Sequence, residues 1–135
     1  GIKVFESKQE QSSRRYKNVI SVGIFGQDGQ QLEIAGTVSR ARDPLLVELN
    51  RYETETNLEG YVIMVENEDR PRVIGPFATL LGDEGVNIAS MKVARQTKGD
   101  KAIMLVNVDN KVEEAVLERL GQLDGILGKP KLLHF

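Results

Sequence analysis

Asn67-Glu68-Asp69-Arg70-Pro71-Arg72-Val73-Ile74-Gly75, followed by Gly85-Val86-Asn87-Ile88-Ala89, decides the fold of this 135-residue chain. The first segment is typical of a strand that ends in polar residues and leads into a helix started by proline. The second is typical of a glycine helix stop and a new strand that opens on asparagine. Because the free N–H groups and the dipole of a helix start favour a carboxylate, the two segments predict a small anionic ligand beside that helix.

Outward from this stretch, residues 61–135 alternate strands and helices. We expect strands at 61–65, 86–95, 102–108 and 129–134 and a helix at 72–84, with Asp69 and Pro71 as its starters. A capping box of Asn110 and Glu113 predicts the start of a second helix, which stops near Gly125. The βαββαβ order predicts a ferredoxin-like unit, with both helices on one face of a four-stranded antiparallel sheet. The apolar face of the first helix is expected to comprise Val73, Ile74, Phe77, Leu80 and Leu81.

Residues 1–60 are β-rich, so the fold class of the whole chain is α+β. Short strands are expected at 2–5, 18–25, 32–38, 45–49 and 52–56, with a polar loop at 7–17 and a hairpin turn at Asp28-Gly29. This half has too little helix to cover its sheet, and the chain does not begin with Met. We therefore expect a fragment of a longer protein, in which a preceding segment completes the first half.

The composition excludes several classes of function. A formal net charge of −2 gives no electrostatic reason to bind nucleic acid. The chain has no Cys and a single His, His134, so thiol metal sites, histidine metal sites and histidine-based catalytic triads are not expected. His134 next to the C-terminus is interpreted as exposed and inert. No apolar run approaches membrane-spanning length, and the lack of Cys fits a reducing compartment.

Residues 61–135 resemble the ACT domain, the amino-acid-binding regulatory module of metabolic enzymes. The motif Asn67-Glu68-Asp69-Arg70-Pro71-x-Val73-Ile74-Gly75 and the later Leu81-Gly82-x-x-Gly85-Val86-Asn87-Ile88-Ala89-x-Met91 resemble the C-terminal end of D-3-phosphoglycerate dehydrogenase. Gly1-Ile2-Lys3-Val4, Tyr16-x-Asn18-x-Ile20-x-Val22 and Ala35-Gly36-Thr37 resemble the intervening allosteric domain found in longer members of that family. The resemblance implies a partial intervening domain at 1–60 and an ACT domain at 61–135.

The family binds L-serine as an effector, and the resemblance implies the residues that do so here. The side chains of Asn67, Asp69 and Asn87 would contact the effector, and the backbone around Val73 and Ile74 would face its carboxylate. The site lies between ACT domains paired edge to edge, which implies a homodimer or tetramer. The catalytic domains and the NAD site would lie in the rest of the parent enzyme, in the cytoplasm or in an organelle. We expect no catalytic residue, metal or cofactor in this chain, and no G-x-G-x-x-G turn occurs in it.

Arg72 departs from the family's motif, which has glycine at this position. The family's backbone comes close to the ligand there. The Cβ and guanidinium of Arg72 either fill the space or bind an effector carboxylate. We expect obstruction or altered specificity rather than a gain, so Arg72 is a modifier of the effector site.

Each candidate residue also has a purely structural interpretation. Asp69 is interpreted alternatively as a helix cap, and Asn87 as the residue that follows the Gly85 turn. Arg40, Arg42 and Arg51 form either an anion site, as the family's intervening domain suggests, or a scattered solvated set; their spacing specifies no common face.

Other functions remain open at this point. One is the regulatory part of another serine-metabolising enzyme, such as the iron–sulfur L-serine dehydratase; another is an ACT pair that binds no effector. A stand-alone enzyme of ferredoxin-like fold, such as an acylphosphatase, lacks the nucleophile–base pair and the glycine-rich loop that it needs. An RNA-binding RRM would need aromatic residues on the central strands, and 86–95 and 102–108 contain none.

Overall fold

The computed structural model describes residues 3–9, 16, 18–25 and 31–135. Contacts within the chain define two compact units, Gly1–Leu58 and Glu59–Phe135. The division expected at residue 60 lies two residues from this one.

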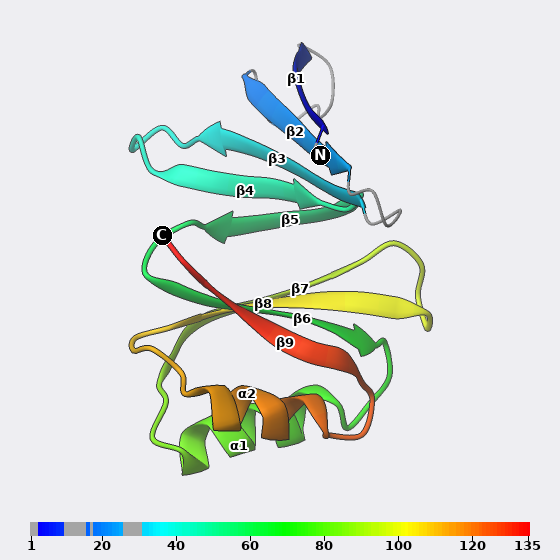
Figure 1. Cartoon of the computed structure of the whole chain (residues 1–135), viewed down its shortest axis with the longest axis vertical. Helices are drawn as coiled ribbons and strands as arrows, with labels where there is room; N and C mark the ends of the chain where they lie inside the picture. The colour runs from blue at the N-terminus through cyan, green and yellow to red at the C-terminus, as the bar shows by residue number, and fades with distance from the viewer. Residues whose placement is uncertain (1–2, 10–15, 17, 26–30) are drawn as a thin grey trace. The chain divides into compact units, whose positions relative to one another are not determined.

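The first unit is a five-stranded antiparallel sheet whose strands lie in chain order. The strands are β1 (Lys3–Gln9), β2 (Val19–Phe25), β3 (Gln31–Val38), β4 (Pro44–Leu49) and β5 (Tyr52–Asn57) (Figure 1). No helix occurs among the described residues of this unit, as its β-rich sequence predicts. The expected loop was wrong for residues 7–9, which continue β1 and pair with β2. An edge strand tolerates such polar residues because it needs partners on one side only. The Asp28-Gly29 turn lies outside the described residues.

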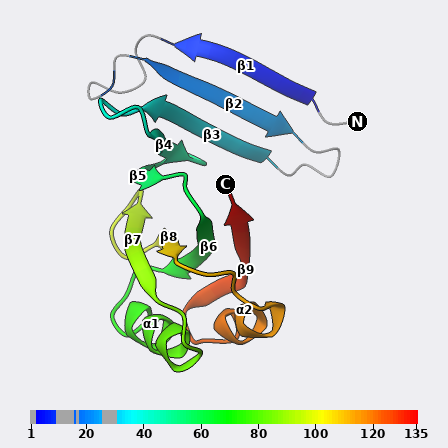
Figure 2. The ribbon, with the colours of Figure 1, turned by 90° about the vertical axis from the view of Figure 1, so that its left-hand side faces the viewer.

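The second unit has the ferredoxin-like order that the sequence predicts. Its elements are β6 (Tyr61–Glu68), α1 (Ile74–Asp83), β7 (Ile88–Arg95), β8 (Lys101–Val108), α2 (Glu114–Gly121) and β9 (Ile126–His134). The sheet is antiparallel with strand order β7-β8-β6-β9, so β6 and β8 are central. Both helices cover the same face of this sheet (Figures 1 and 2).

The core of the second unit lies between the sheet and the two helices. Ile63 and Val65 of β6 and Met104 and Val106 of β8 pack in one cluster with Phe77, Leu81, Leu117 and Leu120 of the helices. The predicted apolar face of α1 is confirmed for the buried Val73, Phe77 and Leu81 and for the partly buried Leu80. It was wrong for Ile74, which is 41% exposed. Val73, Phe77 and Leu81 recur every four residues, whereas Ile74 lies about 100° further round the helix.

The helix starts differ from the sequence prediction. Val73 and Glu113 occupy the N-cap positions, and within the described residues neither helix is capped by a side-chain hydrogen bond. The expected capping box of Asn110 and Glu113 is therefore wrong, because three residues separate Asn110 from the first helical residue.

The end of α1 is as predicted. Gly85 has φ +72°, its N–H donates to the carbonyl of Gly82 at 3.0 Å, and the N–H of Val86 donates to that of Leu81 at 2.9 Å. This pair of bonds is a Schellman motif, in which a left-handed glycine ends the helix. Within the described residues, neither helix has the length and apolar character needed to cross a membrane.

Candidate functional site at the start of helix α1

A tight turn carries the chain from β6 into α1. Pro71 is followed by Arg72 at φ +68°. A proline followed by a left-handed residue is the arrangement that a type II turn uses, and glycine is preferred at its second position. An L-residue held in this conformation costs about 1–2 kcal/mol. The turn itself therefore explains why glycine suits the position of Arg72.

The N-terminal end of α1 carries a partial positive charge that no acidic residue of its first turn compensates. The N–H groups of the first helical residues have no partner within a helix. Val73 turns its side chain into the core, whereas Ile74 and Gly75, the first residues of the helix, are exposed. Among the described residues, Arg72 is exposed and no hydrogen bond or ion pair involves its side chain. This end of the helix thus suits an anion.

Asn67 lies near the end of β6, on the face of the sheet that the helices cover. Its residue is only 2% exposed, and its register partners are Ala102 on β8 and Ile126 on β9. The side-chain Nδ2 donates to the carbonyl oxygen of Glu68 at 2.8 Å. The Oδ1 atom is buried, and no donor reaches it within the described residues. An unsatisfied buried acceptor costs about 1–3 kcal/mol, so a ligand that supplies an N–H donor would recover that energy.

Asp69 forms hydrogen bonds that stabilise the turn between β7 and β8, and it does not cap α1. Its Oδ2 atom accepts from Arg95 Nη1 at 3.0 Å and from the backbone N–H of Gly99 at 2.8 Å. These two donors hold the pKa of the Asp69 carboxyl below its ordinary value of 3.8, with the Gly99 N–H as the larger cause. The alternative interpretation of Asp69 as a helix cap is wrong.

The sequence did not identify Arg95 as part of this site. Arg95 and Asn67 both pair with Ala102, on opposite sides of β8, so strand pairing brings Arg95 to the end of the sheet where Asp69 lies. The only signal in the sequence is the position of Arg95 at the end of a predicted strand. This position indicates a contact with Asp69 only when the strand order is known.

The pKa of Asp69 predicts an acid-sensitive turn. Since its folded-state pKa is depressed, its contribution to stability is complete above the unfolded-state value and is lost as the pH falls through the folded-state value. Between about pH 5 and pH 2, the thermal midpoint of the wild type should therefore fall further than that of Asp69→Asn. The matched control is Asp83→Asn at an exposed position of α1, which should follow the wild type. Equal acid sensitivity of all three proteins would contradict the assignment.

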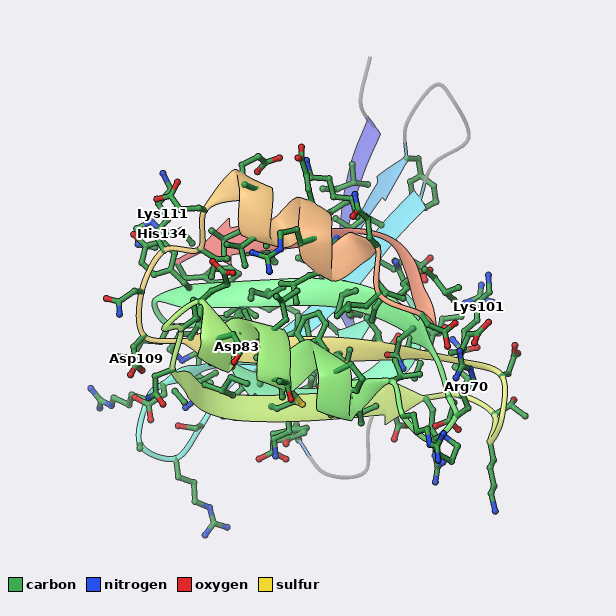
Figure 3. All side chains as sticks on the ribbon, turned by 90° about the horizontal axis from the view of Figure 1, so that it is seen from below. Arg70, Asp83, Lys101, Asp109, Lys111 and His134 are labelled. Carbon is green, nitrogen blue, oxygen red and sulfur yellow. The ribbon has the colours of Figure 1, made fainter. Side chains whose placement is uncertain are left out.

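Asn87 lies at the opposite end of the sheet from Asn67 and Asp69. It precedes β7, and its Nδ2 atom donates to Asp109 Oδ2 at 2.7 Å. The length of β8 separates this end from that of Asn67, about 23 Å for seven steps of about 3.3 Å. Figure 3 shows Asp109 at one end of the unit and Arg70 and Lys101 at the other. One copy of the chain therefore brings Asn67 and Asp69 together without Asn87.

The three arginines proposed as an anion site in the first unit do not meet either. Arg40 and Arg42 lie in the turn between β3 and β4, and Arg51 lies in the turn between β4 and β5, beside Glu33 at 3.9 Å. The six residues of β4 separate the two turns, about 17 Å. His134 is exposed, as expected, and its ring stacks on Tyr61 with 4.4 Å between the ring centroids. The described part of the chain contains no group of acidic or histidine side chains that could hold a metal ion.

Comparison with known proteins gives the class of this unit and the relatives of the chain. Residues 61–125 match the ACT domain family, so this segment of the chain is an ACT domain. The D-3-phosphoglycerate dehydrogenase of Methanocaldococcus jannaschii is 34% identical over 93% of this chain and 23% of that protein. The corresponding values are 30%, 91% and 23% for the Bacillus subtilis enzyme and 34%, 94% and 24% for the Archaeoglobus fulgidus enzyme.

The chain as a whole is related to the C-terminal regulatory part of the D-3-phosphoglycerate dehydrogenases. It spans about a quarter of the length of these relatives. A solved homoserine dehydrogenase from Thiobacillus denitrificans matches 93% of this chain and 36% of its own, at 15% identity and a TM-score of 0.41. A likeness of that degree carries no argument about function.

Proposed function

We propose that this chain is the regulatory part of an NAD-dependent D-3-phosphoglycerate dehydrogenase and that its ACT domain binds an α-amino acid at the start of α1. The NAD site and the catalytic residues of such an enzyme would lie outside these residues. L-serine is the effector that the family resemblance implies and the first ligand to test. The observation that carries the proposal is the buried, unsatisfied Oδ1 atom of Asn67 close to an uncompensated helix start.

The two features match the two ends of an α-amino acid. The ammonium group of the ligand would donate to Asn67 Oδ1, and its carboxylate would accept from the N–H groups at the start of α1. The contacts of Gly125 indicate that the end of β6, where Asn67 lies, is close to the start of α1. A Cβ built on Gly125 would lie 2.5 Å from Val73 Cγ2, and the Gly125 carbonyl accepts from the N–H of Glu68. The residue before α1 and the end of β6 therefore both contact Gly125.

A second copy of the chain would complete the site. β7 is an edge strand that starts beside Asn87 and ends at Arg95, which bonds Asp69. If two copies pair their β7 strands in antiparallel fashion about a two-fold axis, the start of one β7 lies beside the end of the other. This arrangement brings the partner's Asn87 to the end of the sheet where Asp69 lies. Pairing would also cover an exposed sheet edge.

Calorimetric titration of the 135-residue chain tests effector binding. A panel of L-amino acids that includes L-serine and L-aspartate should contain at least one ligand. Asn67→Ala should weaken binding of that ligand by about tenfold or more, the effect of one charge-assisted hydrogen bond. The matched control is Asn107→Ala, because Asn107 lies on β8 and its Oδ1 atom already accepts from Ser90. If no amino acid of the panel binds, the chain is an ACT pair without an effector and the proposal fails.

Cysteine cross-linking tests the pairing of β7. The chain contains no Cys, so a single introduced Cys reports one position without ambiguity. Lys92→Cys, near the middle of β7, should form a disulfide-linked dimer under mild oxidation. Lys131→Cys, at a similarly exposed position on the other edge strand β9, should stay largely monomeric on a denaturing gel. A dimer through Lys131→Cys alone would assign the pairing to β9, and a monomer in sedimentation at high concentration would exclude both.

A further inference from the structure

We propose, on the basis of the effector site above, that Arg72 selects an α-amino acid whose side chain carries a second anionic group. The anionic group is a carboxylate or a phosphate, and the neutral L-serine is then a weak ligand. Arg72 is in this view a specificity-determining residue rather than an obstruction. Three features carry the inference: the charge balance around the turn, the position of Arg72 in the turn and the unsatisfied Asn67.

The charge balance leaves Arg72 as a cation without a counter-ion. Arg70 lies between two carboxylates, with Nη2 2.8 Å from Asp124 Oδ1 and a second ion pair to Glu68. Arg95 is paired with Asp69. Within the part of the chain that the structure describes, Arg72 has no such partner, and the first turn of α1 supplies no acidic residue. A ligand that brings one anionic group leaves either Arg72 or the helix start uncompensated, whereas a ligand with two compensates both.

The turn places Arg72 next to the helix start. Arg72 precedes the N-cap residue Val73, and its left-handed backbone at φ +68° fixes the direction in which its Cβ leaves the chain. A guanidinium presents paired N–H donors that match a carboxylate or a phosphate. Among the described residues Asp69 forms its ion pair with Arg95 and not with Arg72, and the same Oδ2 atom also accepts from the N–H of Gly99.

Asn67 requires that the ligand also have a donor. Its Oδ1 atom lies below the surface without a partner within the described residues, which is a separate observation from the charge around Arg72. A simple dicarboxylate, which has no donor when ionised, would leave this acceptor unsatisfied. An acidic amino acid has an ammonium group for Asn67, a carboxylate for the helix start and a second anion for Arg72.

Two pairs of ligands, each with an acidic and a neutral member, provide the test. The probes are L-aspartate against L-asparagine, which differ in charge but hardly in size, and O-phospho-L-serine against L-serine. By calorimetric titration of the whole chain, at least one acidic probe should bind about tenfold or more tightly than its neutral counterpart. The difference should shrink at high salt, since part of it is electrostatic. A preference for L-aspartate assigns the second anion as a carboxylate, and a preference for O-phospho-L-serine assigns it as a phosphate.

Variants assign the preference to Arg72. Arg72→Gln keeps a long polar side chain and should abolish the preference for the acidic probe, and Arg72→Gly should do the same and bind L-serine at least as tightly as the wild type. Arg42→Gln is the matched control, because Arg42 is also an exposed arginine with a left-handed backbone, at φ +72° in the first unit. If the wild type binds L-serine as tightly as the acidic probes, or if Arg72→Gln keeps the preference, the inference is overturned while the effector site stands. If no probe binds any variant, the effector site itself is wrong, and the inference falls with it.

Discussion

Phe77→Ala should lower the free energy of unfolding of the ACT domain by about 3–5 kcal/mol, the range measured when a buried aromatic ring is truncated. Phe77 has no exposed surface and lies in the middle of α1, between the two other buried residues of its stripe, Val73 and Leu81. Its ring packs in the cluster that joins both helices to β6 and β8. Because protein interiors are close-packed, the neighbours collapse only partly into the space that the ring leaves.

Amide hydrogen exchange in β8 gives the measurement for this variant. The amides of this central strand open only when the ACT domain unfolds, so the slowest of them report its free energy separately from that of the first unit. The control on the same helix is Ile74→Ala, where the side chain is 41% exposed and the expected cost is below about 1 kcal/mol. Equal losses for the two variants would mean that α1 does not pack on the sheet through the Phe77 stripe.

The fold of the ACT domain was predictable because its signals are local. Helical spacing of Val73, Phe77 and Leu81 identified α1 and its buried face, and Gly85 identified its end. The strand boundaries were less predictable. Residues 66–68 extend β6 and residues 126–128 extend β9 beyond the expected ends, because the two strands pair with each other there. The pairing is between segments about sixty residues apart, so no local pattern contains it.

The sequence names candidate residues for the site, but their contacts could not be predicted from it. Asn67 and the residue before α1, Val73, are six positions apart in the sequence, and their role in binding a ligand stays a prediction. The hydrogen bonds of Asp69 to Arg95 and Gly99 join residues about thirty positions apart and depend on strand order. The same holds for Asn87, whose partner Asp109 directly follows β8, 22 positions further along the chain. Tertiary pairing therefore decided which polar groups are occupied and left Asn67 Oδ1 without a partner within the described residues.

The second large effect is expected at Gly125, where Ala should destabilise the ACT domain by about 2–5 kcal/mol. Gly125 has φ +83°, a conformation that costs an L-residue about 1–2 kcal/mol. A Cβ at this position would also lie 2.5 Å from Val73 Cγ2 and 3.2 Å from Arg70 Nη2. Overpacking of this kind costs about 1–3 kcal/mol more, since either the Val73 side chain or the strand end must move. If the proposed effector site is right, the variant should weaken binding there as well, because Val73 is the N-cap of α1.

Two further variants separate backbone strain from the clash. Gly128→Ala has almost the same backbone, at φ +86°, but its Cβ would meet no atom within 4 Å, so it should lose only the conformational part, about 1–2 kcal/mol. Val73→Ala removes Cγ2. The double variant Val73→Ala with Gly125→Ala should therefore lose less free energy of unfolding than the sum of the two single variants, by about 1 kcal/mol or more. Additive losses, or equal losses at Gly125 and Gly128, would show that the Val73 side chain does not clash with a Cβ at position 125. A sub-additive result, in contrast, would show that the loop between α2 and β9 and the start of α1 share one packed contact. In that case we expect a ligand that orders the start of α1 to affect β9 as well, the edge strand that follows Gly125.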